Sequence, residues 1–179
     1  MFLLQQLDHT VKKMKSQLAN FFTIINLSCG VFAILFTLQG ELRVSLLFIT
    51  IAAVFDRLDG AAARKFDCAS DFGKQLDSLT DIISFGVAPA LMIYHAILFD
   101  FGYAGALFTV FYIACGAIRL ARFNITENHN SFIGLPITAA GCILTLLYLA
   151  VGYWPDYTFM FAILILSFLM VSTIRVRKM

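Results

Sequence analysis

Residues 56–81 read DRLDGAAARKFDCASDFGKQLDSLTD, a polar stretch between two apolar runs, Val44–Phe55 and Ile82–Phe99. Val44–Phe55 has about 12 residues, which suits a buried core helix as well as a membrane span. Helix-forming sequence continues through Asp56–Arg64, so we expect one helix that crosses a bilayer and has a polar end. The second run follows a loop of roughly ten residues, so the two helices are expected to be antiparallel neighbours.

The composition of the whole chain favours a membrane protein. Hydrophobic residues make up 60% of the 179 residues and charged residues only 13%, whereas a soluble domain averages about 25% charged residues. A helix of about 20 apolar residues crosses a bilayer. Four uncharged runs meet that length: Ser16–Gly40, Phe101–Ile118, Ser131–Pro155 and Tyr157–Ile174. With the two runs beside the polar stretch, the sequence predicts an all-α integral membrane protein with six transmembrane helices.

The distribution of basic residues tests this count. Six spans place both termini and the second and fourth connections on one side of the membrane. Twelve of the 13 Lys and Arg residues fall on that side, and Arg43 is left opposite. The positive-inside rule makes the basic side cytoplasmic. We therefore expect a multi-pass protein of the cell membrane, with both termini and any active site at the cytoplasmic face. Nothing in the sequence suggests nucleic-acid binding.

Residues 1–18 have a pattern of their own. Apolar side chains recur there at helical spacing among three lysines: Phe2, Leu3, Leu7, Val11, Met14 and Leu18. This predicts an amphipathic helix in the membrane interface, with its lysines near anionic headgroups. The alternative is a frayed basic tail that only sets the topology. We accordingly divide the chain into an interfacial helix, residues 1–18, and a six-helix transmembrane domain, residues 19–179.

The connections between spans are predicted to be short. Tyr153, Trp154 and Tyr157 lie where an outer interfacial belt of aromatic residues is expected. The predicted outer connections are Gly40–Arg43, Asp100–Gly102 and Trp154–Asp156, and the cytoplasmic ones are Lys65–Phe72 and Phe123–Asn130.

Proline and cysteine each add one expectation. Pro89 lies inside the third span, where it removes the hydrogen bond to the carbonyl of Phe85 and is expected to kink the helix. The four cysteines show no CxxC spacing, so we predict no disulfide and no zinc site for Cys29, Cys68, Cys115 and Cys142.

Four aspartates dominate the polar stretch. Asp56 and Asp59 stand three positions apart at the end of span two, and Asp77 and Asp81 stand four apart at the start of span three. Either spacing puts both side chains on one helix face, with Cβ atoms about 5–6 Å apart. Because the two helices are antiparallel neighbours, the four carboxylates are expected to converge at the inner edge of the membrane.

A cluster of four carboxylates needs a cation to offset the repulsion between its charges. An aspartate at the centre of a membrane helix costs about 3 kcal/mol, less near the interface. Mg²⁺ and Mn²⁺ prefer carboxylate oxygens, and two such ions about 3.5–4 Å apart suit phosphoryl chemistry. We therefore predict a divalent metal cofactor, Mn²⁺ or Mg²⁺, with two ions. The alternative is that the aspartates form ion pairs with basic residues nearby, which are Arg57, Arg64, Lys65 and Lys74. Ion pairing could explain one pair of aspartates but not four aspartates in two helical registers.

Small residues accompany the acids. Gly60 and Gly73 leave room on the helix faces for a substrate to approach the backbone, or they let two helices pack closely. Arg64 can bind a phosphate oxygen, or it marks the cytoplasmic boundary.

The polar stretch fits, at every spacing, the signature of the CDP-alcohol phosphotransferases, D-x2-D-G-x2-A-R-x8-G-x3-D-x3-D. The matching residues are Asp56, Asp59, Gly60, Ala63, Arg64, Gly73, Asp77 and Asp81. The chain also resembles the phosphatidylserine synthase branch of that family, although Thr80 stands where the branch more often carries Ala. The resembling segments are FFTIINLSCG (residues 21–30), GKQLDSLTDIISFGVAPAL (73–91), RLARFN (119–124) and FIGLPITAA (132–140).

The resemblance implies a role for each motif residue. Asp56, Asp59 and Asp77 would ligate both metals or one of them, with Asp81 on the second metal. The CDP-lipid would be bound by these residues of the motif: Asp56, Asp59, Gly60, Arg64, Gly73 and Asp77. Asp81 would act as general base on the hydroxyl of L-serine, whose oxygen attacks the lipid-linked phosphorus and releases CMP. The resemblance also implies a homodimer.

Three polar residues are candidates for the acceptor pocket. Arg119 and Arg122 stand three apart at the cytoplasmic end of span four, where they either anchor the helix or bind the serine carboxylate or a phosphate. Asn26 lies within span one and either binds substrate or pairs with a neighbouring helix.

Two other functions are weighed against serine transfer. The first is the same chemistry with glycerol 3-phosphate or inositol phosphate as acceptor, which should need further basic residues. The second is a divalent-cation transporter, which predicts polar residues continuing through the bilayer. The run Val44–Phe55 offers only Ser45 and Thr50 for such a path. The lipid is either diacylglycerol-based or an archaeal ether.

Overall fold

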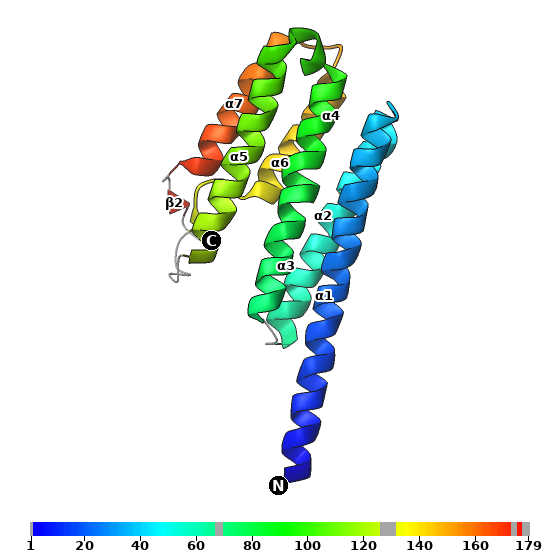
Figure 1. Cartoon of the computed structure of the whole chain (residues 1–179), viewed down its shortest axis with the longest axis vertical. Helices are drawn as coiled ribbons and strands as arrows, with labels where there is room; N and C mark the ends of the chain where they lie inside the picture. Colours follow the sequence, from blue (N-terminus) through cyan, green and yellow to red (C-terminus); the bar gives the residue numbers. More distant parts are fainter. Residues whose placement is uncertain (1, 67–69, 126–131, 173–174, 177–179) are drawn as a thin grey trace.

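The computed structural model describes residues 2–66, 70–125, 132–172 and 175–176, and these form a bundle of helices (Figure 1). Its first half contains α1 (Phe2–Leu38), α2 (Leu42–Phe66), α3 (Asp71–Asp81), the π-helical segment η1 (Ile82–Val87), α4 (Ala88–Ala96) and the 3₁₀ turn η2 (Leu98–Phe101). Its second half contains α5 (Tyr103–Ile125), β1 (Phe132–Ile133), α6 (Ile137–Leu147), the 3₁₀ turn η3 (Tyr148–Ala150), α7 (Tyr157–Val171) and β2 (Arg175–Val176).

The helices are arranged around one central rod. α3, η1 and α4 follow one another without interruption, and α1 and α2 lie on one side of this rod while α5, α6 and α7 lie on the other (Figure 1). The core between them is filled by fully buried side chains: Phe85, Tyr112, Ile137, Leu144 and Ile163. The central rod therefore carries the acidic residues of α3 between the two halves of the bundle.

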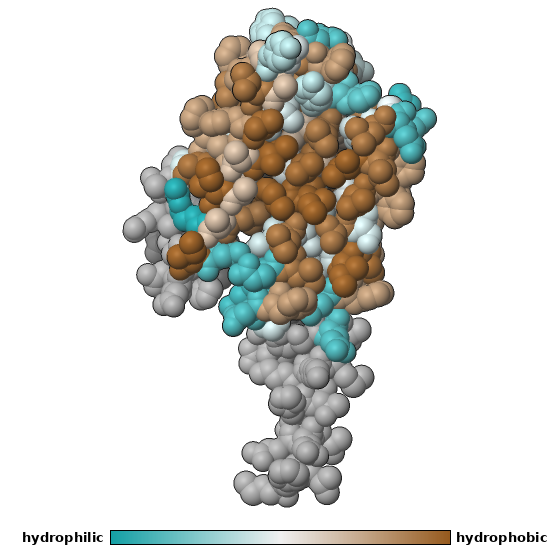
Figure 2. All heavy atoms as spheres, viewed as in Figure 1, coloured by the Kyte–Doolittle hydropathy of each residue, from teal (hydrophilic) through white to brown (hydrophobic). Residues whose placement is uncertain are grey.

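The outer surface confirms an all-α membrane protein. Large apolar side chains cover the face seen in Figure 2, with polar residues gathered towards the ends of the molecule. Three helical segments are long and apolar enough to cross a membrane, residues 20–38, 71–96 and 103–125, and two shorter apolar ones cover 137–150 and 157–171. Six helical rods can be followed in the described residues, and the number that span the membrane stays a prediction.

Several predicted boundaries are corrected. The run Ser131–Pro155 does not form one long helix: α6 starts only at Ile137 and, with η3, ends at Ala150. The reason is local, because Gly134 takes a positive φ of 76° and Pro136 precedes the helix. The predicted loop Phe123–Asn130 is wrong in its first part, since α5 continues through Ile125. At the other connection that was predicted to be cytoplasmic, Lys65–Phe72, α2 ends at Phe66 and α3 begins at Asp71.

The structure near the two ends of the chain also differs from the prediction. α1 is one continuous helix with no break at residues 18 and 19, and the interfacial position of residues 1–18 stays a prediction. Two short strands were not predicted: β1 pairs with β2 antiparallel, Phe132 opposite Val176. The N–H of Leu135 also donates to the carbonyl of Leu169 at 3.0 Å, so the segment before α6 is attached to the end of α7.

Three of the four cysteines lie in the described residues. Among the described residues, Cys29, Cys115 and Cys142 carry free thiols, and Cys68 lies outside the described residues. Between α1 and α2, the hydroxyl groups of Thr37 and Ser45 share a buried hydrogen bond of 2.8 Å. This bond ties the two helices together next to their connecting turn.

The proline in the central rod is accommodated by a change of helix type. The π-helical segment η1 lies directly before Pro89, and the N–H of Ala88 donates to the carbonyl of Ile83, five residues back. The Phe85 carbonyl, which loses its usual partner because proline has no N–H, accepts a hydrogen bond of 3.3 Å from the Tyr112 hydroxyl. A Cβ at Gly141 would lie 2.5 Å from the same carbonyl oxygen. Pro89 thus creates a polar contact between the central rod and α5, close beside α6.

We predict that Tyr112→Phe lowers stability. The substitution leaves the buried Phe85 carbonyl without its donor, which costs about 1–3 kcal/mol and roughly 2–4 °C of Tm for each kcal/mol. Thermal unfolding of the detergent-solubilised protein checks this. Tyr103→Phe is the matched control, because Tyr103 is 93% exposed and should leave Tm unchanged. Equal Tm values for the two variants would contradict the role given to the hydroxyl.

Candidate active site

Three aspartates from two helices meet at one point. Asp56 and Asp59 lie on α2 and Asp77 lies on α3, and their carboxylate oxygens lie within 4.8 Å of one another. Asp81 lies one turn further along α3, is 8% exposed and lines the same cavity as the other three. The convergence expected from the sequence spacings is therefore observed.

Two carboxylate oxygens of this group have no hydrogen-bond partner among the described residues. Asp59 is 5% exposed, and its Oδ2 atom is buried without a hydrogen bond in the described residues. The Oδ1 atom of Asp81 is buried in the same way. A side-chain hydrogen bond from Thr23 reaches Asp59. Anionic oxygens that are buried, close together and unpaired are unstable without a cation.

Two basic residues that were weighed as ion-pair partners, Arg57 and Lys74, do not pair with the cluster in the described part of the chain. Lys74 pairs with Asp71 at 3.7 Å on the exposed face of α3, and Arg57 is exposed and in no ion pair among the described residues. The side chains of Arg64 and Lys65 lie outside the described residues. Since the three side chains that converge here each offer a carboxylate oxygen, the cluster fits a hard divalent cation.

The acidic cluster forms one wall of a cavity of about 280 Å³. Across it lies Arg119 of α5, whose Nε atom is buried and has no hydrogen-bond partner among the described residues. Its guanidinium carbon lies 5.9 Å from the centroid of the Phe123 ring. The cavity is lined by Asp56, Asp59, Gly60, Asp77, Ser78, Asp81, Arg119, Leu120, Phe123, Pro136 and Thr138. It can therefore hold a cation on one wall and an anionic group on the other.

The predicted glycines have different surroundings. Gly60 lines the cavity beside Asp59. Gly73 does not line it: a Cβ at this position would lie 3.1 Å from Oδ1 of Asn20 and 3.1 Å from Oγ of Ser70. The glycine at 73 therefore lets the start of α3 approach α1 closely.

Two of the three candidate acceptor residues lie away from this cavity. Arg122 is on the same helix as Arg119, but its Nη1 atom donates to the carbonyl of Val171 at the end of α7 at 3.2 Å. Asn26 is fully buried on α1, and both atoms of its amide lack partners among the described residues. Its backbone carbonyl accepts a hydrogen bond of 3.2 Å from the Ser84 hydroxyl. Of the three, only Arg119 lines the cavity.

Sequence reasoning missed several residues of the cavity wall. Phe123 follows Arg119 by four positions and so shares its helix face, which is a signal that helical spacing could have provided. Ser78 directly follows Asp77 within the motif. Pro136 and Thr138 come from the start of α6, and only the tertiary structure brings them to the acidic cluster.

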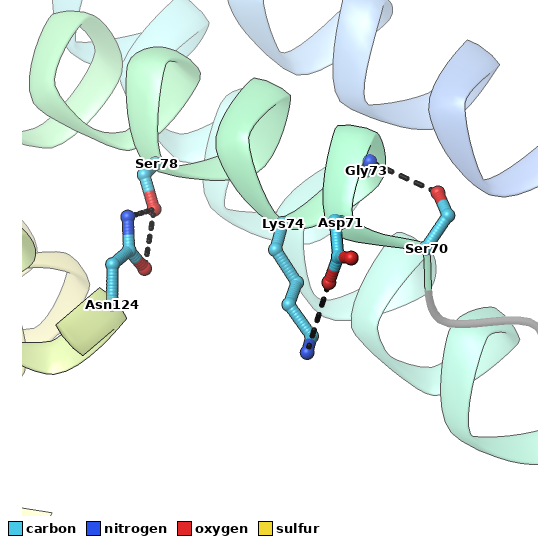
Figure 3. Close-up of polar contacts among 6 residues, drawn as sticks. All are labelled: Ser70, Asp71, Gly73, Lys74, Ser78 and Asn124. Atoms are coloured by element: carbon cyan, nitrogen blue, oxygen red, sulfur yellow. Dashed lines mark hydrogen bonds and ion pairs between the residues drawn. The ribbon is translucent and has the colours of Figure 1, made fainter. Parts of the chain in front are cut away.

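A hydrogen bond between side chains joins the two walls near Ser78. The Oγ atom of Ser78 lies 3.2 Å from Oδ1 and 3.0 Å from Nδ2 of Asn124. Figure 3 draws the two side chains pointing toward each other. The hydroxyl can donate to the first atom and accept from the second. Ser78 follows Asp77 on α3, and Asn124 lies on the helix that carries Arg119, so this contact ties α5 to α3.

The start of α3 is stabilised separately. Ser70 is the N-cap of the helix, and its hydroxyl accepts a hydrogen bond of 3.0 Å from the N–H of Gly73 (Figure 3). Asp71 lies in the first turn, where a negative charge is favourable. These contacts set where α3 begins, and the helical register then places Asp77 and Asp81.

Fold and site together define a helical membrane protein with a cluster of acidic side chains that is compatible with a divalent metal ion. Comparison with known proteins agrees: the model of the CDP-alcohol phosphatidyltransferase family matches residues 16–174. The chain belongs to this family and is therefore an enzyme, a membrane-bound transferase.

Individual relatives are similar over much of their length. The archaetidylserine synthase of Methanothermobacter thermautotrophicus is 39% identical over 168 residues, which cover 91% of this chain and 71% of the relative. The CDP-diacylglycerol–serine O-phosphatidyltransferase of Bacillus subtilis is 40% identical over 126 residues, covering 70% and 71%. The enzyme of the same name from Helicobacter pylori strain 26695 is 36% identical over 165 residues, covering 87% and 70%.

We predict that Asp59→Asn weakens divalent metal binding. Replacing one buried carboxylate of the cluster removes a charge and an oxygen ligand, so Mn²⁺ affinity should fall by at least about tenfold. Titration of Mn²⁺ followed by electron paramagnetic resonance checks this on the purified protein. Asp71→Asn is the matched control, since Asp71 is an exposed aspartate paired with Lys74. Unchanged Mn²⁺ affinity in Asp59→Asn, with the protein still folded, would contradict the metal site.

Proposed function

We propose that this enzyme transfers a phosphatidyl-type group from a CDP-activated lipid to the hydroxyl of L-serine and releases CMP, as a step of phospholipid biosynthesis. The observation that carries the proposal is a single cavity lined by four aspartates and by Arg119, a half-buried arginine whose Nε atom is buried. The printed names of the relatives support the substrates, since each names a serine transferase or an archaetidylserine synthase. The lipid is a diacylglycerol or its archaeal ether equivalent.

The aspartates are proposed to hold the metal, with Asp56, Asp59, Asp77 and Asp81 as ligands of two Mn²⁺ or Mg²⁺ ions. Bound metal supplies charge neutralisation for the diphosphate and for the leaving phosphate. The unpaired buried oxygens of Asp59 and Asp81 support this assignment.

The CDP moiety is proposed to lie against α2 and the start of α3. Gly60 supports this, because it lines the cavity and has no side chain to block an approaching diphosphate. Arg64 follows Gly60 by one helical turn and is proposed to bind a phosphate oxygen. Gly73 is proposed to act indirectly on CDP binding. It lets α3 approach α1 closely, and this approach helps to place Asp77.

The acceptor is proposed to bind at Arg119. A guanidinium group binds a carboxylate with two parallel hydrogen bonds, and the buried Nε of Arg119 lacks a protein acceptor in the described residues. Ser78 and Thr138 line the same cavity and can orient the amino acid with their hydroxyl groups. Arg122 and Asn26 are assigned no direct contact with serine, because Arg122 donates to the end of α7 and Asn26 is absent from the cavity wall.

Asp81 is proposed to be the general base. Its free Oδ1 atom accepts the proton of the serine hydroxyl, and the serine oxygen forms a bond to the lipid-linked phosphorus. The bond from that phosphorus to the bridging oxygen of CMP breaks, and CMP leaves with both electrons of that bond. Orientation by Arg119 keeps the hydroxyl next to Asp81, and this proximity accounts for much of the rate. No covalent enzyme intermediate forms.

The rival acceptors fit the cavity less well. Glycerol 3-phosphate and inositol phosphate carry a dianionic phosphate, and Arg119 is the one basic residue among the described lining residues. A carboxylate needs only that one cation. A transporter is disfavoured because the acids of α2 lie in its second half, while Ser45 near its start is buried and bonded to Thr37.

Orientation and assembly complete the proposal. The excess of Lys and Arg on one side supports a cytoplasmic position for the termini and the active site. Residues 1–18 are proposed to lie in the membrane interface, and the resemblance to the family supports a homodimer.

We predict that purified protein releases CMP from a CDP-lipid when Mn²⁺ or Mg²⁺ and L-serine are present. Glycerol 3-phosphate and inositol phosphate are compared in the same assay, and both should give rates near background. Asp81→Asn should lower serine-dependent release by on the order of 10²-fold or more, whereas Asp71→Asn should retain it. Release with a phosphorylated alcohol alone would overturn the acceptor, and release with none of the three from folded, metal-loaded protein would overturn the proposed reaction.

We predict that Arg119→Gln raises the KM for serine by about 10–100-fold, because a charge-assisted hydrogen bond to a carboxylate contributes about 1.5–3 kcal/mol. Steady-state kinetics at saturating CDP-lipid measure this change. Arg122→Gln is the matched control: it should leave the KM for serine nearly unchanged and lower Tm, since Arg122 holds the end of α7. A larger rise of KM in Arg122→Gln than in Arg119→Gln would reverse the assignment.

A further inference from the structure

A second cavity lies at the opposite end of α2 from the acidic cluster. It has a volume of about 480 Å³ and is lined by Arg43, Leu46, Tyr148, Leu149, Val151 and Tyr153. Arg43 is in the first turn of α2, 13 positions before Asp56. At a rise of 1.5 Å per residue this separates the two sites by about 20 Å along the helix. The second cavity is therefore distinct from the candidate active site.

The polar groups of this cavity lack hydrogen-bond and ion-pair partners among the described residues. Arg43 is exposed and takes part in no ion pair among the described residues, although Glu41 is only two positions away. The described structure likewise contains no hydrogen bond made by the hydroxyl of Tyr148 or of Tyr153. One guanidinium and two phenol hydroxyls thus line one cavity with their donors available to a ligand.

The rest of the wall is apolar and continues onto the outer surface. Leu46, Leu149 and Val151 complete the cavity. Leu149 is 60% exposed, and Leu47 on α2 and Leu146 on α6 are 55% and 62% exposed. In a membrane protein, such outward-facing leucines lie against lipid chains. A ligand of this cavity therefore meets hydrogen-bond donors at one end and a lipid-facing apolar surface beside them.

We infer that this cavity binds an anionic phospholipid, with its headgroup phosphate on Arg43 and its acyl chains along Leu46 and Leu149. Arginine binds phosphate oxygens with two parallel hydrogen bonds. Tyrosines at the membrane interface keep the hydroxyl in the polar layer and the ring in the apolar one. The charge of Arg43 favours an anionic lipid, and the apolar wall favours a lipid over free phosphate. The inference does not depend on the reaction proposed for the acidic cluster.

Trp154 provides a built-in probe of this site. It is the only tryptophan of the chain, it is 54% exposed and it follows Tyr153 directly. Lipids with bromine atoms on their acyl chains quench tryptophan fluorescence on contact. Protein in phosphatidylcholine vesicles is therefore titrated with brominated phosphatidylglycerol or with brominated phosphatidylcholine, and the quenching of Trp154 is recorded.

For the wild-type protein we expect half-maximal quenching at a mole fraction on the order of five- to tenfold lower for brominated phosphatidylglycerol than for brominated phosphatidylcholine, as one cation near the surface contributes about 1 kcal/mol. Arg43→Gln should abolish this preference. Lys74→Gln, which removes an exposed cation near the start of α3 and away from this cavity, should keep it. Tyr148→Phe combined with Tyr153→Phe should reduce it in part.

Three results would overturn the inference. The first is equal quenching by the two lipids in the wild-type protein, and the second is a preference that Arg43→Gln leaves intact. The third is relief of quenching by millimolar inorganic phosphate, which would indicate a site for a free anion. Size-exclusion chromatography of wild type and Arg43→Gln accompanies the titration. A change of oligomeric state without any change of lipid preference would assign the cavity to a contact with a second copy and would also overturn it.

Discussion

Repulsion between carboxylates in a partly buried site is the constraint on which this structure depends. Asp56, Asp59 and Asp77 place their oxygens within 4.8 Å of one another at the end of an apolar helical hairpin. Three like charges at that distance are unfavourable wherever water is scarce. The fold holds them together nonetheless, because packing of α1, α2 and the central rod along their whole length fixes the helix ends that carry the acids. The divalent metal proposed for this site would relieve the repulsion, and the repulsion would then favour its binding.

The remaining elements keep the opposite wall of the cavity in place. Pro89 in the central rod is accommodated by the π-helical segment η1, and the carbonyl of Phe85 finds the hydroxyl of Tyr112 on α5. Ser78 and Asn124 join the same two elements at the cavity. These two hydrogen bonds, from Tyr112 to the Phe85 carbonyl and between Ser78 and Asn124, hold α5 against the central rod. The position of Arg119 relative to the aspartates depends on this packing.

Much of the site could be predicted from the sequence because its chemistry is local. Helical periodicity is enough to place Asp56 with Asp59 and Asp77 with Asp81, since residues three or four positions apart share a face whatever the tertiary structure. The all-α membrane class follows from the scarcity of charge in the apolar runs. The boundaries of α6 did not follow, because Ser131–Pro155 is uniformly uncharged and hydropathy cannot show that Gly134 and Pro136 delay the helix. The pairing of β1 with β2 joins residues about 40 positions apart and has no local signal.

The sequence by itself determined the class of protein, the acidic residues and the helix faces on which they lie, because composition and periodicity are properties of short segments. Only the tertiary structure decided that Arg119 faces the acids while Arg122 holds the end of α7, although the two arginines are three positions apart on one helix. It also brought Thr138 to the cavity and turned Gly73 towards Asn20. The physical reason is that such contacts depend on how helices cross and how closely their backbones approach. Those distances are set by the packing of all neighbouring side chains together.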